Sequence, residues 1–475
     1  MSKPGKPVKS NILDTEKIGG LMFKLSMPVF MGMFVQSMYN IISTIFVGQY
    51  VGPLAIAGLS IAFPLQMVGA GLGQLSGIGG MSLISRLIGA KEYDQAEKAL
   101  GNGIMLSIFL GIVVIIGLLP FLDFWLTLIG ASEAVLPHAR DYMMFITIGM
   151  MAQIVSMAFL NYARAEGNAR VGMIAMIMGA LINIALSAVF IVWLDMGTLG
   201  AGLATLIAQV ASMLYTMSYY VFKKSFLNVR RKNLFPDFRI MRSIFSIGIG
   251  AFTQLFAGSL SSMILINMVV SYGGDYALSA FGIVQRVLLF ANLPAMVISQ
   301  GCQPVLGFNY GARRFKLALK TIYMAMGFAT GLSFLGFVIV YFIPGPIVRL
   351  FSDDPELVSA GIQAARGILM VLPVVGPMMV GTMIFQAIGK PVRAFIAAIA
   401  RPVVFLIPSV ILLTNVFDLG INGIWYSFPA SDAMTFLLTM LLLLPIIKYF
   451  RSTADQQLLD APDGPGAILQ AEGGR

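Results

Sequence analysis

About twelve long apolar stretches, separated by short polar loops, dominate the chain. A helix needs roughly 20 apolar residues to cross a bilayer, and each stretch is long enough for one crossing. The pattern therefore predicts an all-α membrane protein with about twelve transmembrane helices. The predicted spans are about 22–47, 54–82, 98–122, 139–163, 171–193, 199–222, 243–272, 277–306, 317–343, 357–386, 393–414 and 421–448.

The sequence also repeats itself. The segment 89–96, Gly-Ala-Lys-Glu-Tyr-Asp-Gln-Ala, returns as 311–318, Gly-Ala-Arg-Arg-Phe-Lys-Leu-Ala, and each copy follows two predicted spans and precedes four more. An even number of spans separates the copies, so the two halves run in the same direction across the membrane. We expect two six-helix lobes, an N-lobe at 21–222 and a C-lobe at 242–450, joined by a basic linker at 223–241.

The loops alternate sharply in charge. One set is rich in Lys and Arg, including Arg164 and Arg170 between the fourth and fifth spans, whereas the other set is nearly free of them. The positive-inside rule places the basic loops and both termini in the cytoplasm of a multi-pass protein of the cell (inner or plasma) membrane. Segment 1–20 is then a cytoplasmic N-terminal segment, with no apolar core of a signal peptide, and the polar segment 451–475 is predicted to be a disordered tail.

Composition supports this class and excludes others. The residues are 58% hydrophobic and 11% charged, too few charges to cover a soluble protein of this length. The net charge of +10 is spread over short loops, so we expect contact with the lipid bilayer and none with nucleic acid. Cys302 and His138 are the only cysteine and histidine, which argues against a zinc site and a histidine-based catalytic triad. We therefore expect no metal site, no cofactor and no enzymatic activity.

Several polar side chains fall at membrane depth, where they are unfavourable against lipid and should face inward. Two interpretations stay open for them, hydrogen bonding between helices and contact with a substrate or ion. They lie on three predicted helix faces: Gln36, Asn40 and Ser43; Asn183 and Ser187; Thr205 and Gln209.

Three charged residues and a proline also fall within the predicted spans. Asp432 and Arg401 fall at similar depths in neighbouring antiparallel spans, so they form either a structural ion pair or a titratable latch. Arg286 is also deep; it either has a structural partner or lines the cavity, where it would favour an anionic substrate. Pro28 interrupts the first span and is a candidate hinge, with a static kink as the alternative.

At this point the chain resembles the multidrug and toxic compound extrusion (MATE) family. The resemblance rests on Tyr39-Asn-Ile-Ile-Ser-Thr-Ile-Phe-Val-Gly48, on the segment 300–312 and on Gln386-Ala-Ile-Gly-Lys390, and it covers nearly all of residues 20–450. It implies two six-helix lobes that form a V around a central cavity. It also implies export of organic, often cationic, compounds in exchange for protons or sodium.

The chain departs from the family pattern at two positions. Many bacterial members carry an aspartate where this chain has Ser43, and another where it has Ser187, while Asn183 and Thr205 match the family. A neutral serine does not carry protons at physiological pH. If a carboxylate couples ion flow to export here, the second half, with Asp432, is the better place to expect it.

These observations favour a secondary active exporter of small amphipathic organic compounds, driven by antiport with protons or sodium through alternating access. We expect a monomer. The alternative is a flippase or exporter of a lipid-linked or anionic metabolite with atypical coupling, which Ser43, Ser187 and Arg286 favour. A membrane enzyme or non-transporting scaffold finds no support, because no nucleophile–base pair or metal-ligand cluster stands out.

Overall fold

The structure is a computed structural model that describes residues 12–222, 224–351 and 354–459, and these residues contain only helices and turns. The first half contains α1 (Ile18–Tyr50), α2 (Pro53–Gly89), α3 (Tyr93–Leu118), η1 (Leu119–Phe121), α4 (Leu122–Ile129), α5 (Leu136–Ala165), α6 (Ala169–Ser187), η2 (Ala188–Trp193) and α7 (Gly197–Val221). The second half contains η3 (Arg231–Leu234), α8 (Phe238–Gly311), α9 (Phe315–Phe342), α10 (Pro344–Arg349), α11 (Pro355–Ile368), α12 (Leu372–Ala387), α13 (Pro391–Ile399), η4 (Ala400–Leu406), α14 (Ile407–Ile411), η5 (Leu412–Val416) and α15 (Gly420–Leu459).

The predicted membrane-spanning helices are present. Within the described ranges, eleven helices are long and apolar enough to cross a membrane, or twelve if the bent pair α11–α12 forms one span. The helix α8 supplies two of them, which meet at Gly274, where the backbone leaves helical geometry with φ of 62°. The prediction of an all-helical membrane protein is thus confirmed.

The predicted span at 357–386 is broken into two helices. The segment divides into α11 and α12, which meet at an angle of 50°. Pro373 lies in the first turn of α12, where a missing N–H is tolerated. A continuous helix would instead require Pro373 to donate a hydrogen bond to the carbonyl of Leu369, and proline has no N–H to donate.

The prediction of a disordered tail at 451–475 is wrong for its first part, because α15 continues to Leu459. Ala454 is buried, and the side chain of Gln457 donates a hydrogen bond to the carbonyl oxygen of Arg313 at 3.0 Å. These contacts hold the end of the helix against the turn between α8 and α9. The remainder of the predicted tail, residues 460–475, lies outside the described residues, as do residues 1–11 of the predicted N-terminal segment.

The internal repeat is also visible in the backbone conformation of the turns. Residues with positive φ recur at a spacing of 222 or 223 positions, even where the side chain is not glycine. Such conformations are uncommon for residues with a Cβ, so their recurrence marks equivalent turns in the two halves. The pairs are Gly52 and Gly274, Lys91 and Arg313, Gly167 and Gly389, Asp195 and Asp418, and Gly197 and Gly420.

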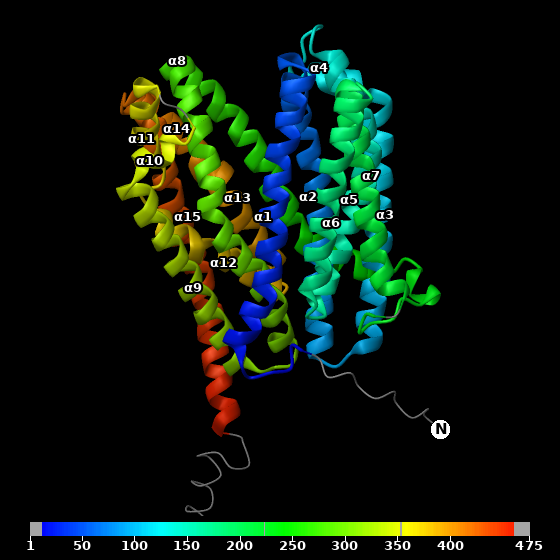
Figure 1. Cartoon of the computed structure of the whole chain (residues 1–475). Helices are drawn as coiled ribbons and strands as arrows, with labels where there is room; N and C mark the ends of the chain where they lie inside the picture. Colours follow the sequence, from blue (N-terminus) through cyan, green and yellow to red (C-terminus); the bar gives the residue numbers. More distant parts are fainter. Residues whose placement is uncertain (1–11, 223, 352–353, 460–475) are drawn as a thin grey trace, which may run out of the picture.

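Figure 1 shows the helices in two bundles, which we call the N-lobe (α1–α7) and the C-lobe (α8–α15). The bundles meet at the end where α1 begins and α15 ends, and they diverge toward the other end. We call the first of these the basic end, because it carries the turns at Lys91 and Arg313 and the basic linker.

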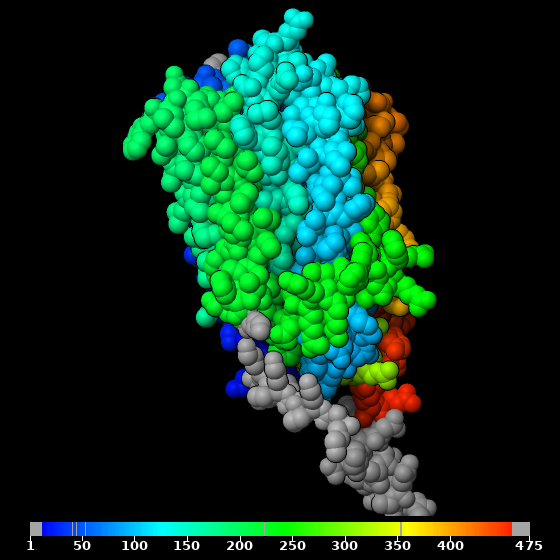
Figure 2. Space-filling view, turned by 90° about the vertical axis from the view of Figure 1, so that its right-hand side faces the viewer, coloured from blue at the N-terminus to red at the C-terminus, as the bar shows by residue number. Residues whose placement is uncertain are grey.

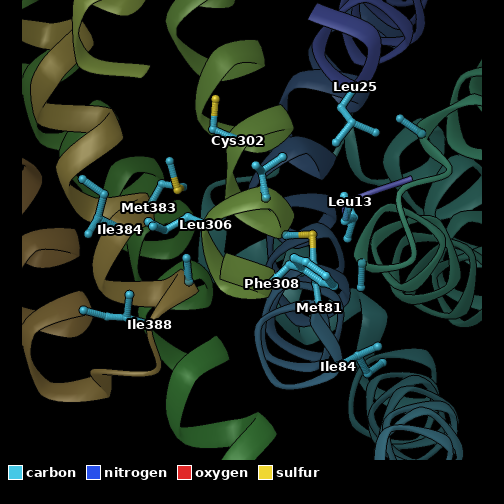
Figure 3. Packing of buried hydrophobic residues seen from close by; sticks show 14 of the residues in the cluster. Leu13, Leu25, Met81, Ile84, Cys302, Leu306, Phe308, Met383, Ile384 and Ile388 are labelled. Carbon is cyan, nitrogen blue, oxygen red and sulfur yellow. The ribbon is translucent and has the colours of Figure 1, made fainter. Parts of the chain in front are cut away.

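A single apolar core joins the two lobes near the basic end. It includes Leu25 of α1, Met81 of α2, Leu306 of α8 and Ile384 of α12, all of which are buried (Figure 3). Burial of apolar surface contributes roughly 25 cal/mol per Å², so this shared core stabilises the arrangement in which the lobes are closed at the basic end. Cys302, the only cysteine of the chain, is fully buried within it.

The linker between the lobes is fixed to the N-lobe by two buried carboxylates. Glu166, which follows α5, accepts hydrogen bonds from the Ser225 hydroxyl at 2.7 Å and from the Phe226 amide at 2.9 Å. Glu97 of α3 forms an ion pair with Arg230 at 2.9 Å. Figure 2 shows the linker, in green, lying on the surface of the N-lobe. The described part of the linker, residues 224–241, is therefore an ordered part of the N-lobe surface.

The free energy of unfolding should depend on pH through Glu166. Burial raises the pKa of Glu166 from 4.5 to about 7, although the hydrogen bonds from Ser225 and Phe226 offset part of the rise. The folded chain then holds a proton that the unfolded chain releases, so this stability is full below pH 4.5 and is lost as the pH rises through about 7. We expect Glu166→Gln, which keeps the acceptor without the charge, to raise the free energy of unfolding at pH 8 by about 1–3 kcal/mol.

Thermal melting of the detergent-purified protein at pH 5 and pH 8 measures this effect. The variant should melt at a higher temperature than the wild type at pH 8 and at a similar temperature at pH 5. Glu92→Gln is the matched control, because Glu92 is an exposed carboxylate at the same end. An equal difference between Glu166→Gln and the wild type at both pH values would contradict the assignment.

Candidate functional site

A cavity of about 300 Å³ lies within the N-lobe and reaches α8 of the C-lobe. Six amide side chains contribute to its lining: Gln36, Gln74, Gln153, Asn183, Gln209 and Gln300. Hydroxyl groups and the thioethers of three methionines, Met33, Met157 and Met176, complete much of the remaining wall. A pocket with apolar walls and a few convergent polar groups is the usual form of a small-molecule site.

Most of the polar residues singled out in the sequence meet at this cavity. Gln36, Asn183, Thr205 and Gln209 line it. The Asn183 amide donates a hydrogen bond to the Thr205 hydroxyl at 3.0 Å, joining α6 to α7. The carbonyl oxygen of the Gln209 side chain is buried and has no hydrogen-bond partner among the described residues. Interhelical bonding therefore accounts for Asn183 and Thr205, whereas the side-chain oxygen of Gln209 is buried against Gly149 of α5.

The other three N-lobe candidates lie differently. Ser187 is buried beneath the cavity wall, where its hydroxyl donates to the Asn183 side chain at 3.3 Å. Ser43 is partly buried on α1 and is not among the residues that line the cavity. Asn40 lies on α1, but its side chain is outside the described part of the structure.

Arg164 is the charged residue of the cavity, and it was not among the expected site residues. It is 4% exposed, and its Nη1 donates to the side-chain oxygen of Gln300 at 2.7 Å and to that of Asn161 at 3.4 Å. The sequence pattern assigned Arg164 to a cytoplasmic loop because it ends a span. The structure corrects this, since α5 continues to Ala165 and carries the guanidinium into the cavity.

In the C-lobe, Arg401 and Asp432 form the ion pair that their similar depths predicted. The Arg401 Nε donates to one carboxylate oxygen of Asp432, and Nη2 lies 3.3 Å from the other. Asp432 is buried on α15, and Arg401 lies in η4, a π-helical segment. Two hydrogen bonds from a planar guanidinium satisfy the carboxylate in a fixed geometry.

Arg286 has no ion pair or hydrogen bond with the residues that the structure describes. It lies near the middle of the second half of α8, and it is exposed while its neighbours Val284 and Val287 are buried in the C-lobe core. Its side chain therefore points away from that core. That Arg286 lines the central cavity stays a prediction.

The two lobes place different chemistry at equivalent positions. The 223-residue spacing that relates Gly197 to Gly420 also relates Gln209 to Asp432. The N-lobe thus has a neutral amide in the wall of a cavity where the C-lobe has a carboxylate in an ion pair. The two halves share a fold but differ in charge at this position.

Pro28 lies within α1, which continues without interruption from Ile18 to Tyr50. Because proline has no N–H, the carbonyl of Lys24 loses its helical partner, which permits bending at this point. The role of Pro28 as a hinge stays a prediction.

The MatE family profile matches this chain over residues 28–189 and 251–411, one segment in each lobe. The multidrug export protein MepA of Staphylococcus haemolyticus is 28% identical over 422 residues, which cover 88% of this chain and 92% of that protein. The structure of the MATE multidrug transporter DinF-BH in complex with rhodamine 6G is 34% identical and has a TM-score of 0.86. That match covers 93% of this chain and 98% of the other.

A more distant structure shows the same fold. A multidrug resistance MATE transporter in its outward-facing conformation is 23% identical, with a TM-score of 0.87, and the match covers 95% of this chain and all of that one. The fold and the order of the helices are therefore shared across proteins whose side chains have largely diverged.

Proposed function

The chain belongs to the MatE family, whose members are transporters rather than enzymes, and from this premise we propose that its multidrug efflux works by alternating exposure of the N-lobe cavity. The observation that carries the proposal is the position of the cavity. It reaches the lobe interface at Gln300, while the shared core closes the lobes at the basic end. Rocking one lobe against the other would open the cavity first to one side and then to the other.

The proposed substrates are small amphipathic organic compounds. Met33, Met157 and Met176 offer flexible, polarizable surface that adapts to different shapes, and the amides around them offer both donors and acceptors. The relatives named as multidrug exporters, and the DinF-BH complex with rhodamine 6G, are consistent with this class of substrate.

The proposed coupling uses protons or sodium and acts through the C-lobe. No carboxylate lines the described N-lobe cavity, and Ser43 and Ser187 do not ionise. Among the described residues of the C-lobe, Asp432 is the buried carboxylate, and its ion pair with Arg401 would break or form when a cation competes for it. We place the coupling step at this pair.

The proposed orientation puts the basic end and both termini in the cytoplasm of the cell membrane. The basic linker, Lys91 and Arg313 lie at that end, in agreement with the positive-inside rule. We also propose a monomer, because one chain supplies both lobes and every residue of the cavity wall described above.

Transport in proteoliposomes tests the function directly. We expect the purified protein to move rhodamine 6G or fluorescein against its concentration gradient when a pH gradient or a sodium gradient is imposed. Vesicles with protein but no ion gradient, and vesicles without protein, are the controls. Failure of both dyes to respond to either gradient would contradict antiport.

A further inference from the structure

The charge of the N-lobe cavity is unusual for a site that receives organic cations. Arg164 is the charged residue of its described lining, and no Asp or Glu lines it. The remaining polar groups are amides and hydroxyls, which carry no net charge. The potential inside the cavity is therefore positive, whereas an organic cation would require the opposite sign.

Arg164 is buried without a counter-ion. Within the described residues it forms no ion pair, its Nη1 contacts only the neutral side chains of Gln300 and Asn161, and its Nε has no hydrogen-bond partner. Glu166 is two residues away, but its carboxylate faces the linker and accepts hydrogen bonds from Ser225 and Phe226. A buried charge normally has a partner of opposite charge, and even Arg401, which is partly exposed, pairs with Asp432. Arg164 thus has capacity for an anion that the protein does not supply.

We propose that the N-lobe cavity binds the anionic group of an amphipathic substrate, such as a carboxylate, sulfonate or phosphate, at Arg164. The planar guanidinium matches the geometry of such oxyanions and binds them through two parallel hydrogen bonds. The methionines of the wall then contact the apolar part of the molecule. This inference rests on the proposed function, because it names the class of substrate that enters the same cavity.

Gln300 makes the affinity of the site for an anion depend on which side of the membrane the cavity faces. It belongs to α8 of the C-lobe, so its bond to Arg164 of α5 crosses between the lobes at the floor of the cavity. When the lobes separate at the basic end, Arg164 loses Gln300 and becomes available to an anion from that side. When they close again, Gln300 competes with the bound anion for the guanidinium. Affinity is then lower in the state that opens to the opposite side, as export requires.

Two dyes with the same phenylxanthene core and opposite charge test the inference. Fluorescein is an anion at pH 8, and rhodamine 6G is a cation. We measure the binding of each to detergent-purified protein by fluorescence anisotropy. The wild type should bind fluorescein, and Arg164→Gln should weaken that binding about 10- to 100-fold, the effect expected for loss of charged hydrogen bonds. The affinity for rhodamine 6G should stay the same or increase.

Two further variants distinguish a binding residue from a structural one. Gln300→Ala should increase the affinity for fluorescein, because it removes the competitor for Arg164, and Arg164→Lys should keep part of the affinity because it keeps the charge. Arg170→Gln is the control, since it removes one exposed positive charge six positions away, outside the cavity lining. It should leave both dyes unaffected.

The outcomes separate the inference from the proposed function. The anion site is overturned if the wild type binds rhodamine 6G but not fluorescein, or if Arg164→Gln weakens the binding of both dyes equally. Neither result contradicts the proposal that the protein is an exporter. If the wild type binds and transports neither dye, both proposals fail. Melting temperatures of all variants show that folding is retained, and Arg164→Gln should melt no lower than the wild type because it removes an unpaired buried charge.

Discussion

Asp432→Asn is expected to lower the free energy of unfolding by about 1–4 kcal/mol, less than for a fully buried ion pair, because the Arg401 side chain that loses its partner is partly exposed. The substitution leaves the Arg401 guanidinium beside a neutral amide, and the Asp432 position on α15 is almost fully shielded from solvent. Thermal or chemical unfolding in detergent measures the loss. Ser43→Ala serves as the comparison, because Ser43 is only partly buried and lies outside the cavity lining, so its effect should be within about 1 kcal/mol.

The same pair allows stability and coupling to be separated. Replacing both charges by apolar residues, as in the double variant Arg401→Met with Asp432→Leu, removes the uncompensated charge and should recover most of the lost stability. If the carboxylate couples ion flow to export, the double variant should still bind dye but no longer respond to a pH or sodium gradient. A double variant that is as strongly coupled as the wild type would show that the pair is only structural.

The hydrophobic pattern was sufficient to predict the helices because the bilayer requirement acts on each segment alone. A span must satisfy its own backbone hydrogen bonds and present apolar side chains to lipid. The same local reasoning failed at the end of α15, where a hydrogen bond from Gln457 to Arg313 holds the helix beyond the predicted span. This correction comes from a tertiary contact, which the average hydropathy of the segment does not register.

The site was harder to predict because its main charge lies at a span end. Arg164 was counted as a loop residue, since an arginine after a hydrophobic stretch is the ordinary sign of a cytoplasmic boundary. The packing of helices around the end of α5 buries Arg164, and α8 brings Gln300 to within 2.7 Å of it. That hydrogen bond joins residues 136 positions apart. The sequence around either residue contains no pattern that predicts it. The ion pair between Arg401 and Asp432, which lies within one lobe, could be predicted because the two residues fall at similar depths in neighbouring spans.

Substitution of alanine for Gly89 and Gly311 together is expected to shift the protein away from the state that is closed at the basic end and to reduce transport about tenfold or more. These glycines begin the two copies of the repeated turn, and the copies pack against each other between the lobes. A Cβ at Gly89 would overlap the carbonyl oxygen of Phe308, and a Cβ at Gly311 would overlap that of Arg86. Overpacking of this kind costs about 1–3 kcal/mol per site unless the surfaces separate.

The effect can be assigned to the lobe interface because neither glycine has the positive φ that would itself disfavour alanine. Cys302 provides the measurement, since it is the only cysteine and is buried in the core that the lobes share. Opening at the basic end should expose its thiol, so a maleimide reagent should label the double variant faster than the wild type. Gly327→Ala is the control, because a Cβ there meets no other atom within 4 Å. Equal labelling rates in the double variant and the wild type would mean that the repeated turns do not form the contact that holds the lobes closed.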